Sequence, residues 1–366
     1  MIAQKRPARR VAGIAAAGLA IVAVLTLAVL PSPSRTPTAP RLTFAIAPGL
    51  TSVTPQGLAR TMAFLRQLKA TERPLVVRLY SVFPGDTTAA ASWGAYRIYL
   101  SRVLGAFERG GFDVELVVRY APLHDRGSQS DVRAFSALVR RIVAAFGASR
   151  RFVSIQITNE ADLTASRASD GYFNRGDAAW RALIRGVITA KTTARSHRFG
   201  QLKVGFNYAA HKKAFWRYLG QHGGTRFTDA LDWIGIDTYA GTLTPLPAGG
   251  LRRGVAEAIR REVNGARHVY FPLARIPERV ALHFSENGYA TGNGHSYAMQ
   301  VTALTTAVET VASLSRASHV TEYDWFELRD ASGSSKRPQS QLGLLTHDYR
   351  PKPAFSAYRR LVQGFG

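Results

Sequence analysis

A rhythm of strand-like and helix-like stretches, repeated eight times after residue 41, most constrains the fold of this chain. Each unit opens with a short run of β-branched and other apolar residues, and these runs lie at 42–49, 74–81, 113–122, 151–160, 202–209, 231–240, 281–289 and 320–328. Longer segments with apolar residues at helical spacing follow, at 54–69, 92–109, 129–147, 175–196, 211–221, 295–316 and 352–363. Such alternation predicts a parallel sheet whose strands are joined by right-handed helical crossovers.

Eight such units in about 325 residues favour an α/β fold of the (β/α)8 type, the TIM barrel, over a doubly wound sheet. The first run ends in AIAPGLTS, which lacks the glycine-rich fingerprints of dinucleotide and P-loop sites. The stretch 249–279 is less regular because Pro272 and Pro277 interrupt it. We expect a loop that governs specificity within 241–280.

Composition indicates a globular protein with a basic surface. Hydrophobic residues make up 46% of the chain and charged residues only 20%, so the chain can bury a large core and is not a disordered polyelectrolyte. The net charge of +24 suggests contact with an anionic cell-envelope polymer or a membrane surface, although a general bias toward arginine explains it equally well. No nucleic-acid recognition motif accompanies the charge, so we expect no nucleic acid partner.

The amino-terminal residues have the pattern of a targeting segment. Residues 1–10 are basic and residues 11–30 are uncharged and mostly apolar, which predicts either a cleaved signal peptide or a retained membrane anchor within 1–30. A Pro/Ser/Thr linker at 31–41 leads to the predicted catalytic barrel, 42–366. Because positive charge precedes the apolar stretch, we expect the barrel to be extracellular or to face outward from the membrane.

Two glutamates at the ends of predicted strands are the leading candidates for catalysis. Glu160 ends the run 151–160, and Glu286 lies near the end of the run 281–289. The carboxyl ends of barrel strands form the functional face of this fold, and a pair of carboxyl groups there is what glycoside hydrolysis requires. The alternative is that they are solvated loop carboxylates or members of a structural ion pair.

These residues and their neighbours resemble a known clan. With Asn159-Glu160 on the fourth strand and Glu286-Asn287-Gly288 on the seventh, the chain resembles the large clan of retaining glycoside hydrolases with a (β/α)8 barrel. The resemblance implies that Glu160 is the acid/base, that Glu286 is the nucleophile and that Asn159 binds the sugar 2-hydroxyl. It also favours β-linked substrates. The chain departs from many clan members at the sixth strand, where Asp237-Thr238-Tyr239 stands in place of His-x-Tyr.

Further polar and aromatic residues near strand ends are candidates for substrate binding. Arg78 and Tyr239 can stabilise an ionised carboxylate, and the resemblance implies that both contact Glu286. The alternative for Arg78 is an ordinary salt bridge within the barrel. Trp325 occupies the clan's position for an aromatic floor under the sugar, with a core aromatic as the alternative. His124 and Asn207 follow or end other strands, where they can reach sugar hydroxyls.

Metal and cofactor chemistry find little support in the sequence. The chain has no cysteine, and its nine histidines show no HExxH motif or paired spacing, so we expect no metal and no cofactor. Glu115 and Glu322 lie within or near the start of strands, away from the functional face, and we interpret them as structural.

The sequence therefore predicts an exported retaining glycoside hydrolase that cleaves an oligosaccharide or polysaccharide through a glycosyl-enzyme intermediate. Two alternatives remain open. The barrel could bind cell-envelope glycan without cleaving it, or it could be a transglycosidase that passes the same intermediate to a sugar acceptor.

Overall fold

The structure is a computed structural model that describes residues 41–49, 54–69, 74–82, 89–122 and 128–366. The chain divides into two units at residue 38, and all described residues belong to the second unit, Ala39–Gly366. The predicted targeting segment 1–30 and residues 31–40 of the linker lie outside the described residues, and their assignments remain predictions.

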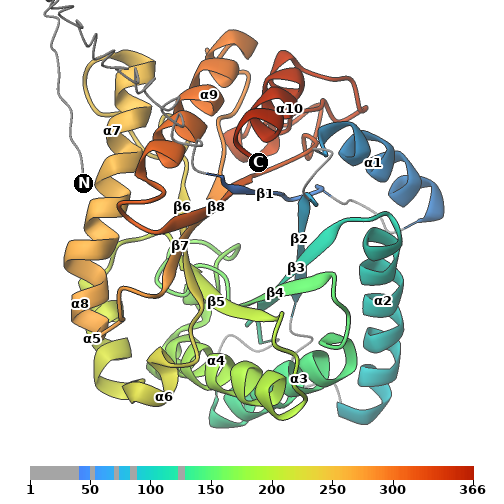
Figure 1. Cartoon of the computed structure of the whole chain (residues 1–366), viewed down its shortest axis with the longest axis vertical. Coiled ribbons are helices and arrows are strands. Elements are labelled where there is room, and N and C mark those ends of the chain that lie inside the picture. The colour runs from blue at the N-terminus through green and yellow to red at the C-terminus, as the bar shows by residue number, and fades with distance from the viewer. Residues whose placement is uncertain (1–40, 50–53, 70–73, 83–88, 123–127) are drawn as a thin grey trace, which may run out of the picture. The chain divides into compact units, whose positions relative to one another are not determined.

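The second unit is built around a closed barrel of eight parallel strands, which confirms the predicted fold (Figure 1). The strands are β1 (Thr43–Ile46), β2 (Val76–Val82), β3 (Asp113–Arg119), β4 (Phe152–Ile157), β5 (Lys203–Tyr208), β6 (Trp233–Thr238), β7 (Ala281–Asn287) and β8 (Val320–Trp325). They pair in chain order, and β8 returns to pair with β1. All eight carboxyl ends therefore lie on one rim of the barrel, where the ends of β4 and β7 bring the two glutamates.

The helices lie around the outside of the strands (Figure 1). They are α1 (Pro55–Leu68), α2 (Ala89–Arg109), α3 (Gln129–Phe146), α4 (Ala178–Ser196), α5 (Lys213–His222), α6 (Gly224–Thr228), α7 (Gly250–Gly265), α8 (Phe271–Ala274), α9 (Tyr297–Leu314) and α10 (Pro353–Phe365). Short 3-10 turns span Asp170–Phe173, Arg175–Asp177 and Pro338–Ser340. No helix among the described residues is both long and apolar enough to cross a membrane.

The stretch 249–279 is more helical than its sequence suggests. Helix α7 continues through a π-helical turn, Ala266–Tyr270, into α8. Pro272 is the second residue of α8, directly after the π-helical turn, and the helix continues through it. Most of the expected specificity loop is thus helix, and the irregular parts are residues 239–249 and 275–280.

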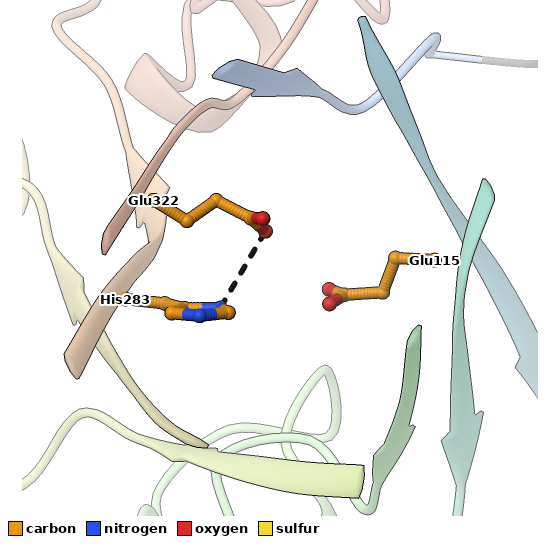
Figure 2. A group of neighbouring side chains, drawn as sticks. All are labelled: Glu115, His283 and Glu322. Carbon is orange, nitrogen blue, oxygen red and sulfur yellow. Dashed lines mark ion pairs between the residues drawn. The ribbon is translucent and has the colours of Figure 1, made fainter. Parts of the chain in front are cut away.

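Alternation along the strands separates an apolar layer from a polar barrel interior. Residues such as Val77, Ile155 and Phe206 are buried in the main hydrophobic core. The alternate residues point into the barrel, where side chains on different strands contact one another: Arg78, Glu115, Ser154, Gln156, Asn207, Asp237, His283, Ser285, Glu322 and Asp324. Figure 2 shows Glu115, His283 and Glu322 reaching into this interior from β3, β7 and β8. Barrels of this type usually fill that space with Val, Ile and Leu, so this interior is unusually polar.

Candidate active site

The end of β4 holds Glu160 in an uncommon backbone conformation. Thr158 and Glu160 have positive φ angles of 64° and 47°, which are rare for residues with a Cβ, and rarer for a β-branched one. Two hydrogen bonds fix this turn: the Asn159 backbone N–H donates to Asp170 at 2.8 Å, and the Glu160 N–H donates to Asn207 Oδ1 at 2.8 Å. Strained backbone held by surrounding contacts is common at functional sites.

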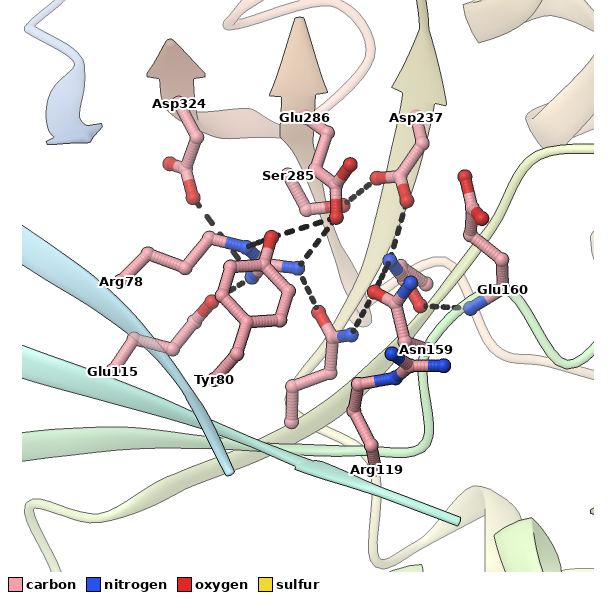
Figure 3. Close-up of polar contacts among 12 residues, drawn as sticks. Arg78, Tyr80, Glu115, Arg119, Asn159, Glu160, Asp237, Ser285, Glu286 and Asp324 are labelled. Carbon is pink, nitrogen blue, oxygen red and sulfur yellow. Dashed lines mark hydrogen bonds and ion pairs between the residues drawn. The ribbon is translucent and has the colours of Figure 1, made fainter. Parts of the chain in front are cut away.

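The end of β7 turns Glu286 toward the same space. The register with β6 shifts between Ile236 and Asp237, and such a bulge lets Ser285 and Glu286 both face the barrel interior. Tyr80 donates a hydrogen bond to one carboxylate oxygen of Glu286 at 2.7 Å (Figure 3). Tyr239 donates to the other oxygen, also at 2.7 Å.

Arg78 adds a positive charge beside this carboxylate. Its Nη2 lies 3.7 Å from Glu286 Oε1 and donates to Gln156, while Nε donates to Tyr80 and Nη1 to Glu115. Arg78 is fully buried, so both interpretations of it hold: it lies beside Glu286 and it forms a salt bridge inside the barrel. Two hydroxyl donors and a guanidinium around one carboxylate suit negative charge.

Glu160 lies in a different environment. Carboxylate oxygens of Glu160, Asp237 and Glu286 lie within 4.8 Å of one another. Burial, and next the negative charge of Glu286, raise the pKa of Glu160 to about 8, although a hydrogen bond from Ser169 and the charge of Arg119 oppose this. Glu160 is therefore protonated at neutral pH, so it can donate a proton.

Asp237, which stands where many clan members have histidine on the sixth strand, is part of the same cluster as Glu160 and Glu286. Asp237 accepts hydrogen bonds from Ser285, at 2.6 Å, and from the Asn207 side chain. Burial, followed by the charges of Glu286 and Glu160, raises the pKa of Asp237 well above its usual range. Asp237 thus ties β5, β6 and β7 together beneath the two glutamates.

Asn159 and Asn207 form a hydrogen-bonded pair at the base of the site. Asn207 Nδ2 donates to Asn159 Oδ1 at 3.0 Å, and its second amide hydrogen goes to Asp237. Asn207 is fully buried, and its oxygen accepts the Glu160 N–H. The structure thus makes Asn207 a support for Glu160 and leaves it no amide hydrogen for a sugar hydroxyl. Asn159 is 5% exposed.

Phe326, and not Trp325, packs against the two tyrosines that hold Glu286. Trp325, the candidate for the floor under the sugar, is 1% exposed and belongs to the main hydrophobic core. Its surroundings are those of a core aromatic, which was the alternative interpretation. The Phe326 ring meets those of Tyr80 and Tyr239 edge-on, at centroid distances of 6.2 and 6.3 Å. The strand-to-loop transition at the end of β8 decides which of the two neighbours faces the site. His124 lies outside the described residues.

Tyr80 is a candidate that sequence reasoning did not identify, and Phe326 and Glu327 are the two residues that follow Trp325. All three line a cavity of about 260 Å³ that also reaches Arg78 and Tyr99. Burial raises the pKa of Glu327 to about 8, with Asp330 as the next cause. Tyr80 had a signal in the sequence, because in VVRLY it lies two residues after Arg78 and hence on the same face of the strand.

Two groups of side chains among the described residues have the donor types and spacing to hold a metal ion. One is Glu160, Asp237 and Glu286, and the other is Glu115, His283 and Glu322. The first group coincides with the hydrogen-bonded cluster described above, whereas the second lies deeper in the barrel.

Comparisons with known proteins support the architecture. No protein-family model matches the chain, and no curated protein matches it. Among solved structures, a GH5_18 protein from Bifidobacterium longum subsp. infantis is similar, with a TM-score of 0.62 and 14% identity over 88% of this chain and 79% of that chain. A GH5_18 protein from Streptomyces cattleya, in complex with GlcNAc, has a TM-score of 0.60 and 16% identity over 89% and 81%. A family 1 β-glucosidase from Thermotoga maritima has a TM-score of 0.58 and 13% identity over 83% and 85%. At these identities the likeness establishes the barrel fold alone.

Proposed function

We propose that this protein is a retaining glycoside hydrolase in which Glu160 is the acid/base and Glu286 the nucleophile. One observation carries the proposal: two glutamates with oxygens within 4.8 Å of each other have opposite environments. Glu160 has a pKa raised to about 8, while Glu286 accepts two tyrosine hydroxyls near Arg78. Retaining enzymes place their carboxyl groups about 5–5.5 Å apart, whereas inverting enzymes need about 6.5–9.5 Å to admit a water molecule.

In this mechanism the two glutamates act in sequence. Glu160 gives its proton to the glycosidic oxygen as the bond from that oxygen to the anomeric carbon breaks, and a Glu286 oxygen bonds to the anomeric carbon. A water molecule then attacks the anomeric carbon and passes a proton to Glu160, while the bond to Glu286 breaks. Tyr80, Tyr239 and Arg78 hold Glu286 in the orientation for attack.

The substrate we propose is a β-linked oligosaccharide or polysaccharide. The fold likeness supports a carbohydrate, since the similar structures include a protein solved with GlcNAc and another solved with Manβ1-4GlcNAc. Three residues of the site carry groups suited to a sugar. Asn159, which precedes Glu160, has an amide; Phe326, which packs against Tyr80, has an aromatic ring; and Glu327, which lines the same cavity as Tyr80, has a carboxyl group.

The test is a screen of the purified chain against aryl glycosides and polysaccharides, with Glu286→Ala beside it. We expect turnover by the wild type, none by the variant, and a first product whose anomeric configuration, read by NMR, matches that of the substrate. An inverted product would contradict the retaining mechanism, and full activity in Glu286→Ala would contradict the assignment of the nucleophile.

The same screen distinguishes the alternatives. A transglycosidase would form a new glycoside when a sugar acceptor is added. A binding barrel would retain glycan in both the wild type and Glu286→Ala without releasing product.

We also propose that the protein is exported. The support is the basic, then apolar, pattern of residues 1–30, which predicts a signal peptide or an anchor. Fractionation of cells that produce the full chain tests this, because protease added outside intact cells should digest an outward-facing barrel.

A further inference from the structure

A second cluster of titratable side chains lies inside the barrel, deeper than the catalytic glutamates. Glu115 on β3, His283 on β7 and Glu322 on β8 point toward a common space from different sides of the barrel (Figure 2). One ligand atom from each lies within 4.8 Å of the others. These residues take no part in the proposed hydrolysis.

The distance between His283 and Glu322 suits two ligands of one metal ion better than a direct hydrogen bond. His283 Nδ1 lies 3.5 Å from Glu322 Oε1 and has no hydrogen-bond partner among the described residues, although only 9% of the residue is exposed. Buried polar atoms normally find partners. Two ligand atoms that are each about 2.1 Å from a tetrahedral zinc ion lie roughly 3.4 Å apart, close to the separation found here.

The charges around the cluster do not balance within the described residues. Glu115 and Asp324 share the guanidinium of Arg78, and Asp324 Oδ2 is 3.9 Å from it, beyond hydrogen-bonding distance. Asp324 is 1% exposed, and its carboxyl group interacts with that of Glu322, which lies two residues earlier on the same face of β8. Three buried carboxyl groups beside one arginine need either protons or another cation, because unpaired buried charge is costly.

The surrounding side chains prepare the cluster for a metal. The Trp233 ring stacks on His283 at a centroid distance of 4.5 Å and an interplanar angle of 6°, which fixes the imidazole. Ser154 donates to Glu115 Oε2 at 2.7 Å and accepts from Trp233 Nε1 at 3.0 Å. Such outer contacts orient metal ligands.

A route from solvent leads to the cluster from the opposite rim to the active site. A cavity of about 340 Å³ opens at the amino ends of the strands, and it is lined by residues near those ends, including Thr43, Val76 and Lys203. His283, Glu322 and Ser154 also line it. An ion can therefore reach His283 and Glu322 without passing Glu160 and Glu286.

We propose that a divalent transition-metal ion of the zinc type binds between Glu115, His283 and Glu322 and ties β3 to β7 and β8 inside the barrel. One imidazole nitrogen and two carboxylate oxygens suit zinc, whereas magnesium prefers oxygen ligands alone. The ion has a structural role, which distinguishes it from the proposed chemistry at the other rim.

The probe for this site is Zn²⁺ added to the full chain after treatment with a chelator. We expect one bound equivalent by calorimetry and elemental analysis, and a rise in melting temperature with Zn²⁺ but not with Mg²⁺. Glu322→Gln, which keeps the shape of the side chain, should weaken Zn²⁺ binding by more than about 100-fold, since losing an outer contact alone costs about 10- to 100-fold. His283→Gln is the second variant, and Co²⁺ absorption reports an imidazole–carboxylate site in the wild type.

Two controls separate this site from others on the chain. Glu286→Gln alters the acidic cluster at the active site, and His211→Gln removes the half-buried histidine that contacts Glu262 at 2.5 Å; both variants should bind Zn²⁺ like the wild type. Equal binding by Glu322→Gln and wild type, loss of binding in Glu286→Gln, or no Zn²⁺ binding at all would overturn the proposal. In the last case the carboxyl groups are neutralised by protons.

Discussion

The protonation of Glu160 predicts how activity depends on pH. Because burial and Glu286 raise the pKa of Glu160 to about 8, the proton needed for the leaving group is present below that pH and lost above it. We expect kcat/KM for an unactivated glycoside to fall as pH rises through about 8. Glu160→Gln should lower kcat/KM by about 10²- to 10⁴-fold, the usual contribution of a general acid.

Two controls identify the group responsible for this pH dependence. Burial also raises the pKa of Glu327 to about 8, so the fall should persist in Glu327→Gln if Glu160 causes it. An aryl glycoside with a strongly acidic leaving group needs no protonation and should react as well above pH 8 as below. A fall that disappears in Glu327→Gln would assign the proton to Glu327 instead.

Tyr80 should affect activity through the orientation of Glu286. Its hydrogen bond at 2.7 Å goes to a charged acceptor, and such bonds contribute about 1.5–3 kcal/mol, so Tyr80→Phe should lower kcat/KM roughly 10- to 100-fold. Tyr358→Phe is the matched control, because that hydroxyl donates to the Ala45 carbonyl at 2.7 Å. It should cost about 1 kcal/mol of unfolding free energy and leave kcat/KM unchanged. Equal activity losses in both variants would indicate a general effect on stability.

Single residues differed in how well the sequence predicted them. Asn159, Glu160 and Glu286 lie where their motifs placed them relative to the strands, because strand ends are readable from the apolar runs. The environment of Trp325 could not be predicted from the sequence. The exact residue at which β8 ends decides whether Trp325 or Phe326 faces the site, and the apolar run does not define that residue. His283 and Glu322 come from different strands, so no local spacing marks them as a pair.

At the scale of elements, a glycine on β5 makes room for an aromatic ring on β6. Gly205 is in register with Trp233, and a Cβ at Gly205 would overlap the Trp233 ring. Gly205→Ala should therefore lower the free energy of unfolding by about 1–3 kcal/mol, as overpacking does. Urea denaturation measures the change. Gly200→Ala is the control, because its Cβ would meet nothing within 4 Å, and a comparable loss there would contradict the packing argument.

Whole elements were predicted well wherever the apolar pattern was regular. All eight strands were found because buried parallel strands are continuous apolar runs between amphipathic helices. The pattern failed across 249–279, since a proline through which a helix continues has the same sequence signature as one in a loop. Tertiary register, which shifts at the ends of β6 and β7, is set by side-chain packing and is not encoded in a local pattern.

At the scale of the whole molecule, charge predicts how the protein interacts with polyanions. The 48 Lys and Arg residues against 24 Asp and Glu should cause retention on an anionic polymer at low salt. Since the Debye length falls from about 10 Å at 0.1 M to about 3 Å at 1 M salt, retention should be lost across that range. A neutral polysaccharide column is the control, and retention that does not change with salt would indicate specific glycan binding instead.

The pairing of β1 with β8 has a consequence for how the protein is made. Thr43 pairs with Glu322, and the Leu42 N–H donates to the Phe365 carbonyl at 2.8 Å, so both ends of the barrel sequence meet at one seam. A ribosome releases the amino-terminal strand long before its partner, and contacts between distant residues form slowly. The barrel therefore stays open throughout synthesis, and a chain in that state can still be threaded through a membrane before the seam closes.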